Sequence, residues 1–187
     1  VEVQNASGEA ANCSTIVGSF VSSGVDLIMA NGTTALQSAA AATTTIPILG
    51  TSITEYGVAL GIDGFTGTTG MNVSGTSDLA PLDQQAAMLQ EWFPDAKNVG
   101  LLYCSAEPNS LYQVETVQGY LEEMGYTCTP YSFSDSNDLS AVATNACAQS
   151  DVLYIPTDNT AATNAELIGN IAQSSATPII AGCLLYT

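Results

Sequence analysis

The sequence has no arginine and no histidine, and Lys97 is its single lysine. Eighteen acidic residues stand against that one cation, so the formal net charge at pH 7 is −17. Proteins hold nucleic acids and anionic lipid surfaces chiefly through Lys and Arg side chains, so the composition excludes both as partners. Ion-pair networks cannot support the fold either. Packing and hydrogen bonds must do so.

The absence of histidine removes the usual general base, the commonest zinc ligand and every Ser–His or Cys–His pair. No C-x-x-C motif is present, so the zinc-ribbon and thioredoxin signatures are missing as well. We therefore expect no catalytic residue, no metal and no cofactor. The cysteines are expected to be small buried residues, with a disulfide as the alternative. They are Cys13, Cys104, Cys128, Cys147 and Cys183.

No apolar run reaches the roughly 18 residues that cross a bilayer, and the N-terminus has neither a basic nor an apolar signal region. Any export signal or membrane anchor is expected to lie outside this segment. With 46% hydrophobic residues over 187 positions, the chain can bury a core, so a globular protein is expected.

Short apolar runs alternate with helix-like stretches, and this alternation predicts an α/β fold with parallel sheets. Residues 57–75, where glycine recurs every third position, are predicted to be irregular crossing segments. The predicted strands are residues 1–3, 25–30, 46–49, 99–103, 127–133, 152–155 and 178–181. The predicted helices are residues 14–22, 34–43, 81–92, 110–124, 139–148 and 161–173.

The two halves of the chain repeat each other. VDLIMANGTTA at residues 25–35 matches SDVLYIPTDNTA at 150–161, and TTIPILG at 44–50 matches SATPIIAG at 175–182. The matching segments begin about 125–131 residues apart, and a repeat of this length favours two Rossmann-like lobes over a short-period solenoid. We predict an N-terminal lobe at residues 1–76 that lacks its first strand and helix, and a C-terminal lobe at 77–187 that lacks its closing segment. The intact protein is therefore expected to extend at both ends.

In each copy a strand runs into a turn rich in Thr, Asn and Asp, followed by a helix. Open α/β sheets bind ligands at the carboxyl ends of their strands, where helix N-terminal amides face the solute. Two such edges facing each other would form a ligand cleft between the lobes. The predicted ligand-binding residues are Ser105, Glu107, Asn109, Ser110, Thr157, Asp158, Asn159, Asn31, Thr33, Thr34, Thr51, Ser52, Thr76, Ser77 and Asp78.

Each of these positions has a plainer alternative. Asn109 or Ser110 could serve only as a helix cap, and residues 157–159 could form a plain capped turn. Gly32 makes a simple turn equally plausible in the first copy. Residues 76–78 lie where the chain should cross between lobes, so they could form a hinge instead of contacting the ligand. Residues 135–138 lack the glycine and final glutamate of a calcium loop and are predicted to cap a helix.

Several runs together resemble the substrate-binding components of ABC transporters of the tryptophan/tyrosine-type family. They are VEVQNA, CSTI, VDLIMA, NVSGTSD, YCSAEPNS, YIPTDNT and PIIAG, in order along nearly the whole chain. The resemblance implies a periplasmic-binding-protein type I fold and an ABC transporter permease as partner. It also implies an amino-acid-like, often aromatic ligand, and an exported lipoprotein in Gram-positive members. Family members usually place an acidic residue where this chain has Cys183, and they are usually rich in lysine.

The leading hypothesis is an extracytoplasmic solute-binding component of an ABC importer, either periplasmic or a cell-surface lipoprotein, rather than an enzyme. The alternatives are a ligand-sensing ectodomain of the same fold and a hydrolase that uses Glu107 and Asp158 as paired carboxylates. For an amino acid, we expect the ligand carboxylate at Ser105, Asn109 and Ser110, where a helix begins. The ligand ammonium is expected at Asp158 or Glu107.

Overall fold

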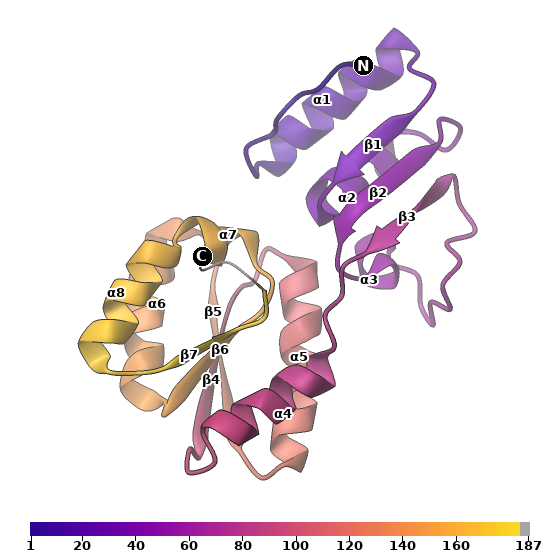
Figure 1. Ribbon diagram of the computed structural model, residues 1–187. Coiled ribbons are helices and arrows are strands. Elements are labelled where there is room, and N and C mark those ends of the chain that lie inside the picture. Colours follow the sequence, from indigo (N-terminus) through magenta and orange to yellow (C-terminus); the bar gives the residue numbers. More distant parts are fainter. Residues whose placement is uncertain (184–187) are drawn as a thin grey trace. The chain divides into compact units, whose positions relative to one another are not determined.

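The computed structural model describes residues 1–183 and divides into two compact units, Val1–Leu79 (unit 1) and Ala80–Thr187 (unit 2) (Figure 1). Every strand pair among the described residues is parallel, so the predicted α/β class is confirmed. The predicted lobe boundary between residues 76 and 77 falls within a strand and remains a prediction. The last four residues of the predicted C-terminal lobe lie outside the described part of the chain.

Unit 1 is a three-stranded sheet in the order β1-β2-β3 with three helices. Its core joins Val17 of the first helix and Leu36 of the second to Ile28 and Ile48 of the sheet. Parallel sheets are normally covered on both faces, yet Met29, on the other face of β1, is 71% exposed. The elements are α1 (Ala10–Ser23), β1 (Ile28–Asn31), α2 (Thr33–Ala42), β2 (Ile48–Ile53), α3 (Tyr56–Leu60) and β3 (Val73–Ser77).

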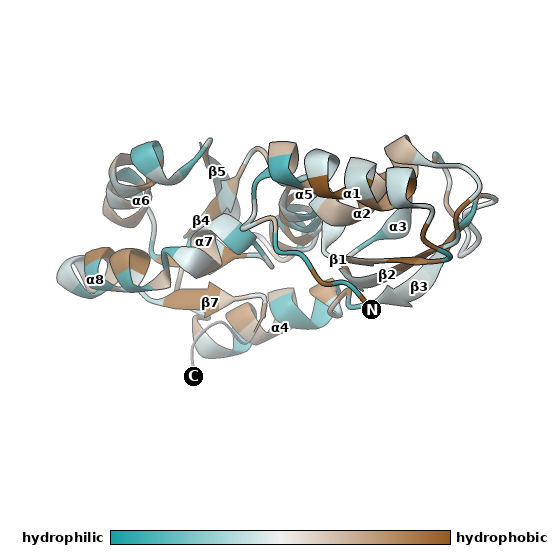
Figure 2. Cartoon of the chain, turned by 90° about the horizontal axis from the view of Figure 1, so that it is seen from above, coloured by the Kyte–Doolittle hydropathy of each residue, from teal (hydrophilic) through white to brown (hydrophobic). Residues whose placement is uncertain are grey.

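Unit 2 is a four-stranded sheet in the order β5-β4-β6-β7 with helices on both faces. Figure 2 shows β7 as a hydrophobic strand and α8 with alternating hydrophobic and hydrophilic bands, as expected of an amphipathic covering helix. The elements are α4 (Leu82–Trp92), β4 (Asn98–Cys104), α5 (Pro108–Glu123), β5 (Thr127–Phe133), α6 (Ser136–Gln149), β6 (Val152–Ile155), α7 (Asn159–Thr163), α8 (Ala165–Ser175) and β7 (Ile179–Ala181).

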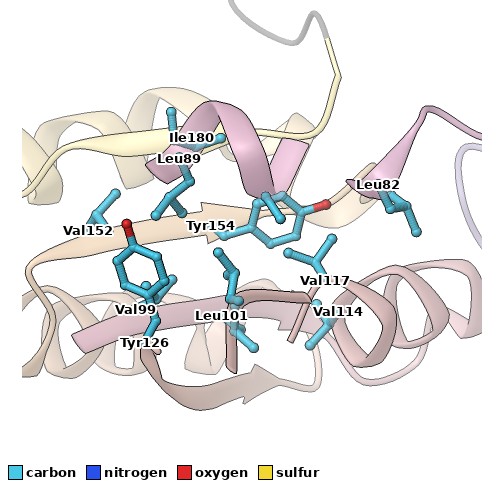
Figure 3. Packing of buried hydrophobic residues seen from close by; sticks show 12 residues of the cluster. Leu82, Leu89, Val99, Leu101, Val114, Val117, Tyr126, Val152, Tyr154 and Ile180 are labelled. Carbon is cyan, nitrogen blue, oxygen red and sulfur yellow. The ribbon is translucent and has the colours of Figure 1, made fainter. Parts of the chain in front are cut away.

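Alternate residues of the central strands enter two different cores. Leu101 and Tyr154 pack with α4 and α5, where Figure 3 shows Leu89 and Val117 directed toward the same interior. Leu102 packs on the opposite face, with α6 and α8. Because both faces are covered, every residue of β6 is buried, which explains its uninterrupted apolar sequence.

The predicted strand at residues 1–3 is wrong, because those residues form no regular structure. By the internal repeat they correspond to β5, whose partner in unit 2 is β4. Residues 1–79 contain no counterpart of β4. A strand there would leave its backbone donors and acceptors without partners in the unit, so none forms.

The prediction that residues 57–75 are irregular is also wrong in part, because α3 and β3 fall within or across them. Glu55 caps α3 by accepting the Val58 N–H at 2.6 Å, and Gly61 ends the helix with φ 64°. β3 pairs with β2 in the register Gly50↔Gly75. Of the five residues of β3, four are exposed, so the sequence lacks the apolar run that marks a strand.

The predicted helix at residues 161–173 is two helices, α7 and α8, which meet at Asn164. The Asn164 side chain donates to the Thr160 carbonyl at 2.8 Å, and its backbone has φ −109° and ψ 21°. Local side-chain bonds of this kind compete with helix continuation. The remaining predicted helices and strands are confirmed, with ends that shift by up to four residues.

Candidate functional site

The candidate site in unit 2 lies where β4 and β6 end side by side. Because these strands are parallel neighbours, the loop after Cys104 and the loop after Ile155 meet at one edge of the sheet. The structure thereby brings together seven of the predicted residues, which we call the unit 2 edge. They are Ser105, Glu107, Asn109, Ser110, Thr157, Asp158 and Asn159.

Glu107 joins the two loops of this edge. Its Oε2 accepts hydrogen bonds from the backbone N–H of Asn159 at 2.9 Å and from the Asn159 side chain at 2.8 Å. Its Oε1 accepts from the N–H and the hydroxyl of Thr160, both at 2.8 Å. Glu107 is only 8% exposed, so this carboxylate at the start of α5 serves as a cap for the start of α7.

Asp158 is more deeply buried, at 1% exposure, and also binds backbone groups. Its Oδ2 accepts from the Cys104 N–H at 2.7 Å and its Oδ1 from the Ala161 N–H at 2.8 Å. Burial, and then the nearby negative charge of Glu107, raise the pKa of Asp158. The first three N–H groups of α7 are all bound to carboxylates, so they are not open to an anionic ligand.

Asn109 and Ser110 do not cap α5 but hold the other loop. The Asn109 amide and the Ser110 hydroxyl each donate to the Thr157 carbonyl at 3.1 Å. Gln113, which the sequence reasoning missed, joins them from the next turn of α5. Its position four residues after Asn109, on the same helix face, is the sequence signal that could have identified it.

The accessible polar groups of the unit 2 edge are fewer than predicted. Ser105 and Asn159 are exposed, and Thr157 and Thr160 are half-buried. The N–H and hydroxyl of Ser105 both donate to the Phe133 carbonyl, at 2.9 and 3.2 Å, which fixes Ser105 to the end of β5. These groups, rather than the carboxylates, are the ones that a ligand in solution can reach.

The unit 1 edge comprises the predicted residues at the ends of β1 and β2: Asn31, Thr33, Thr34, Thr51 and Ser52. The Gly32 N–H donates to the Thr51 carbonyl at 2.9 Å, which ties the two strand ends together. Gly32, with φ 94°, begins α2 without a side-chain cap, and the first turn of α2 contains no acidic residue. The start of α2 is therefore more electropositive than the start of α7.

The predicted residues Thr76 and Ser77 end β3, Asp78 follows them, and all three are exposed. They bind other parts of unit 1: the Ser77 hydroxyl donates to the Thr54 carbonyl at 2.8 Å, and the Asp78 N–H to the Ile53 carbonyl at 3.0 Å. The Thr76 carbonyl accepts from the Tyr56 hydroxyl at 3.3 Å. Whether they act as a hinge or touch a ligand remains a prediction.

Within residues 1–183 no group of three or more Cys, Asp or Glu side chains is placed to hold a metal ion. Asp135 and Asp138 form a capping box at the start of α6, which confirms the prediction that these residues cap a helix rather than form a calcium loop. Cys104 and Cys147 are buried, and burial raises the pKa of both thiols. In the described part of the chain, no helix combines the length and apolarity that a membrane span requires.

Residues 1–183 match the sequence profile of the family described as ABC transporter substrate binding protein. The tyrosine-binding protein of Clostridioides difficile (strain R20291) is 33% identical over 181 residues, which is 97% of this chain and 52% of that protein. The chain thus spans about half the length of this curated relative.

Two solved structures are close in fold. The ABC domain from Streptococcus pneumoniae in complex with L-Trp has a TM-score of 0.92 and 30% identity, over 97% of this chain and 61% of that one. A conserved domain protein from Vibrio cholerae has a TM-score of 0.91 and 28% identity, over 98% and 62%. The predicted periplasmic-binding architecture is confirmed, and the chain belongs to the family of ABC transporter substrate binding proteins.

Proposed function

We propose that this chain binds an amino acid outside the cytoplasm and delivers it to the permease of an ABC importer. The observation that carries the proposal is the unit 2 edge, where two loops are locked together by buried side chains at the carboxyl ends of parallel strands. Relatives named for tyrosine and solved with L-Trp support an aromatic amino acid as the ligand.

The charge of the unit 2 edge, taken by itself, supports one orientation of a ligand bound there. Glu107 and Asp158 make the unit 2 edge negative. Lys97 immediately precedes the first residue of β4, so it lies at the opposite end of that strand from this edge. This edge favours the ligand ammonium, with Ser105, Thr157 and Asn159 as the direct contacts. Asp158 was our expected direct acceptor, but both its oxygens already bind N–H groups, so we propose that it acts through its charge.

The unit 1 edge, taken by itself, offers donors that suit an anionic group. The open N–H groups at the start of α2, with the hydroxyl of the half-buried Thr34, favour an anion by dipole and by hydrogen bonding, whereas Thr33 is buried at 6% exposure. The sequence predicts the ligand carboxylate at the start of α5. The side chains of Asn109 and Ser110 donate to the Thr157 carbonyl instead, so they are not available to a ligand carboxylate.

The proposal includes the absence of catalysis. A glycosidase-type pair needs one carboxyl group that protonates the substrate and a second that faces it. Glu107 and Asp158 are both buried and bind five backbone or side-chain donors of α7 and one N–H of β4. They therefore act as structural carboxylates, which favours binding over hydrolysis.

Calorimetric titration with L-Trp, L-Tyr and L-Leu tests this function. We expect at least one of them to bind. Tryptamine, which lacks the carboxylate, and indole-3-propionate, which lacks the ammonium, should each bind at least about tenfold more weakly. Asn159→Ala should weaken binding, whereas Asn145→Ala, an exposed asparagine on α6, should not. Absence of binding to every amino acid tested, or analogues that bind as tightly as the amino acid, would overturn the proposal.

A further inference from the structure

Gln113 is a fully buried polar side chain in the middle of α5, with 0% exposure. Its Nε2 donates to the Asn109 carbonyl at 2.9 Å and to the Thr157 carbonyl at 3.2 Å. Its Oε1 accepts from the Thr157 N–H at 3.2 Å. One carboxamide thus binds both backbone groups of a single residue, as a neighbouring strand would.

Thr157 is in a position that needs such a partner. The β6–β7 ladder ends at the pair Ile155↔Ala181, and Pro156 then carries the chain out of the sheet. Three side chains of α5 converge on the Thr157 carbonyl oxygen, those of Asn109, Ser110 and Gln113. A carbonyl oxygen has only two lone pairs, so the three donors share them, and the oxygen is fully satisfied although it has left the ladder.

This arrangement leaves the Thr157 side chain available. Its hydroxyl makes no hydrogen bond among the described residues, although the backbone of Thr157 is fixed on both sides. The residue is half-buried, beside the exposed Asn159. A fixed residue with an open hydroxyl is what a binding site needs to orient a polar ligand.

We propose that Gln113 is a positioning residue for ligand binding: it clamps the Thr157 peptide so that the Thr157 hydroxyl is held in place for the ligand. The inference rests on the proposed function, since it assumes that the ligand binds at the unit 2 edge. It predicts that the contribution of the Thr157 hydroxyl to affinity exists only while Gln113 is present.

A double-mutant cycle with Gln113→Leu and Thr157→Val tests this dependence. Leucine fills similar space but removes every hydrogen bond of the carboxamide. We expect Thr157→Val to weaken amino-acid binding about tenfold in the parent chain and less than about twofold in the Gln113→Leu background. The matched control is Gln118→Leu, which removes a surface bond to Glu122 on the same helix and should leave both values unchanged. Additive losses of affinity would overturn the proposal.

Hydrogen exchange tests the clamp without any ligand. Relative to the Leu153 N–H of β6, which reports general stability, the Thr157 N–H should exchange at least about tenfold faster in Gln113→Leu than in the parent chain. Unchanged relative exchange would overturn the clamp. If Gln113→Leu does not fold, Gln113→Met carries the same comparison, because methionine also fills similar space and also removes the acceptor for the Thr157 N–H. Failure of the parent chain to bind any amino acid would instead overturn the proposed function, whatever the exchange shows.

Discussion

Two aspartates of unit 2 illustrate how local surroundings decide what a carboxylate does. Asp158 is buried beside Glu107, and burial is the main cause that raises its pKa. Asp151 lies at the surface, where the N–H groups of Asn98 and then Lys97 lower its pKa. Both bind backbone N–H groups, but only Asp158 gives up its hydration to do so.

These opposite shifts predict opposite pH dependence. The stability that Asp158 contributes is present below its unfolded pKa of 3.8 and is lost as the pH rises through its raised folded pKa. The contribution of Asp151 is present above 3.8 and is lost as the pH falls through its lowered folded pKa. Urea unfolding measures the free energy of unfolding of each variant relative to the parent chain. From about pH 3 to about pH 7, this difference should therefore become more favourable for Asp158→Asn and less favourable for Asp151→Asn. Parallel curves for the two variants would contradict this.

Asp158→Ala should lower the free energy of unfolding more than loss of an ordinary helix cap does. It leaves the buried N–H groups of Cys104 and Ala161 without their acceptor, at about 1–3 kcal/mol each. Asp135→Ala, which removes the exposed cap of α6, should cost only about 1 kcal/mol. Denaturant titration of both variants measures the difference. Equal losses would show that the Asp158 bonds add nothing beyond a cap.

The sequence predicted which residues of the candidate site would come together, but not what each of them binds. The repeat of strand, polar turn and helix identified both loops of the unit 2 edge, because that pattern is local. The role of Glu107 depends on contacts with residues 52 and 53 positions later, which no local pattern encodes. Gln113 was missed for a related reason: a glutamine in a helix reads as a surface residue until the loop that it binds is in place.

At the scale of elements, the pairing of β2 with β3 depends on two glycines that face each other. A Cβ on Gly75, whose φ is +151°, would collide with the Gly50 backbone and the Tyr56 hydroxyl. That hydroxyl donates to the Gly50 carbonyl at 3.1 Å, across the place where the side chain would lie. β3 therefore joins the sheet by close backbone approach rather than by apolar side chains.

Gly75→Ala should destabilise unit 1 by more than about 2 kcal/mol, because the added methyl group meets backbone atoms that cannot move aside. Gly70→Ala is the matched control. Its φ of +66° is also in the left-handed region, but nothing lies within 4 Å of an added Cβ, so it should cost about 1 kcal/mol. Thermal unfolding of both variants measures the contrast, and a Gly75→Ala variant no less stable than Gly70→Ala would refute it.

Elements were predictable from sequence where a two-sided core dictates them. The bounds of β6 agree with the prediction because its apolar run is buried on both faces of the sheet. The bounds of β5 agree as well, although Phe133 is the one buried residue of that edge strand. β3 carries a single buried residue, Val73, and its glycine-based pairing gives no periodic signal. The strand expected at residues 1–3 failed for the opposite reason, since its apolar pattern is present but a neighbouring strand is not.

At the scale of the whole molecule, the scarcity of cations leaves hydrogen bonds to satisfy the polar interior. Throughout residues 1–183, every buried side-chain nitrogen or oxygen has a hydrogen-bond partner. Backbone N–H groups take the place of Lys and Arg as partners for carboxylates at Asp138, Asp151 and Asp158. This solution satisfies individual carboxylates but does not cancel their charge, so the net charge of −17 remains.

Uncancelled charge of this size should make stability depend on salt in the direction opposite to that of a protein held by ion pairs. Like charges repel more strongly in the compact state than in the expanded chain. Sodium chloride shortens the screening length from about 10 Å at 0.1 M to about 3 Å at 1 M, so it should raise the Tm. Each 1 kcal/mol gained in the free energy of unfolding corresponds to about 2–4 °C in Tm.

Replacing Glu115 and Glu123, both exposed on α5, with glutamine should raise the Tm at low salt and reduce its response to salt. A Tm that falls steadily as sodium chloride is added would mean that attractive charge pairs outweigh this repulsion.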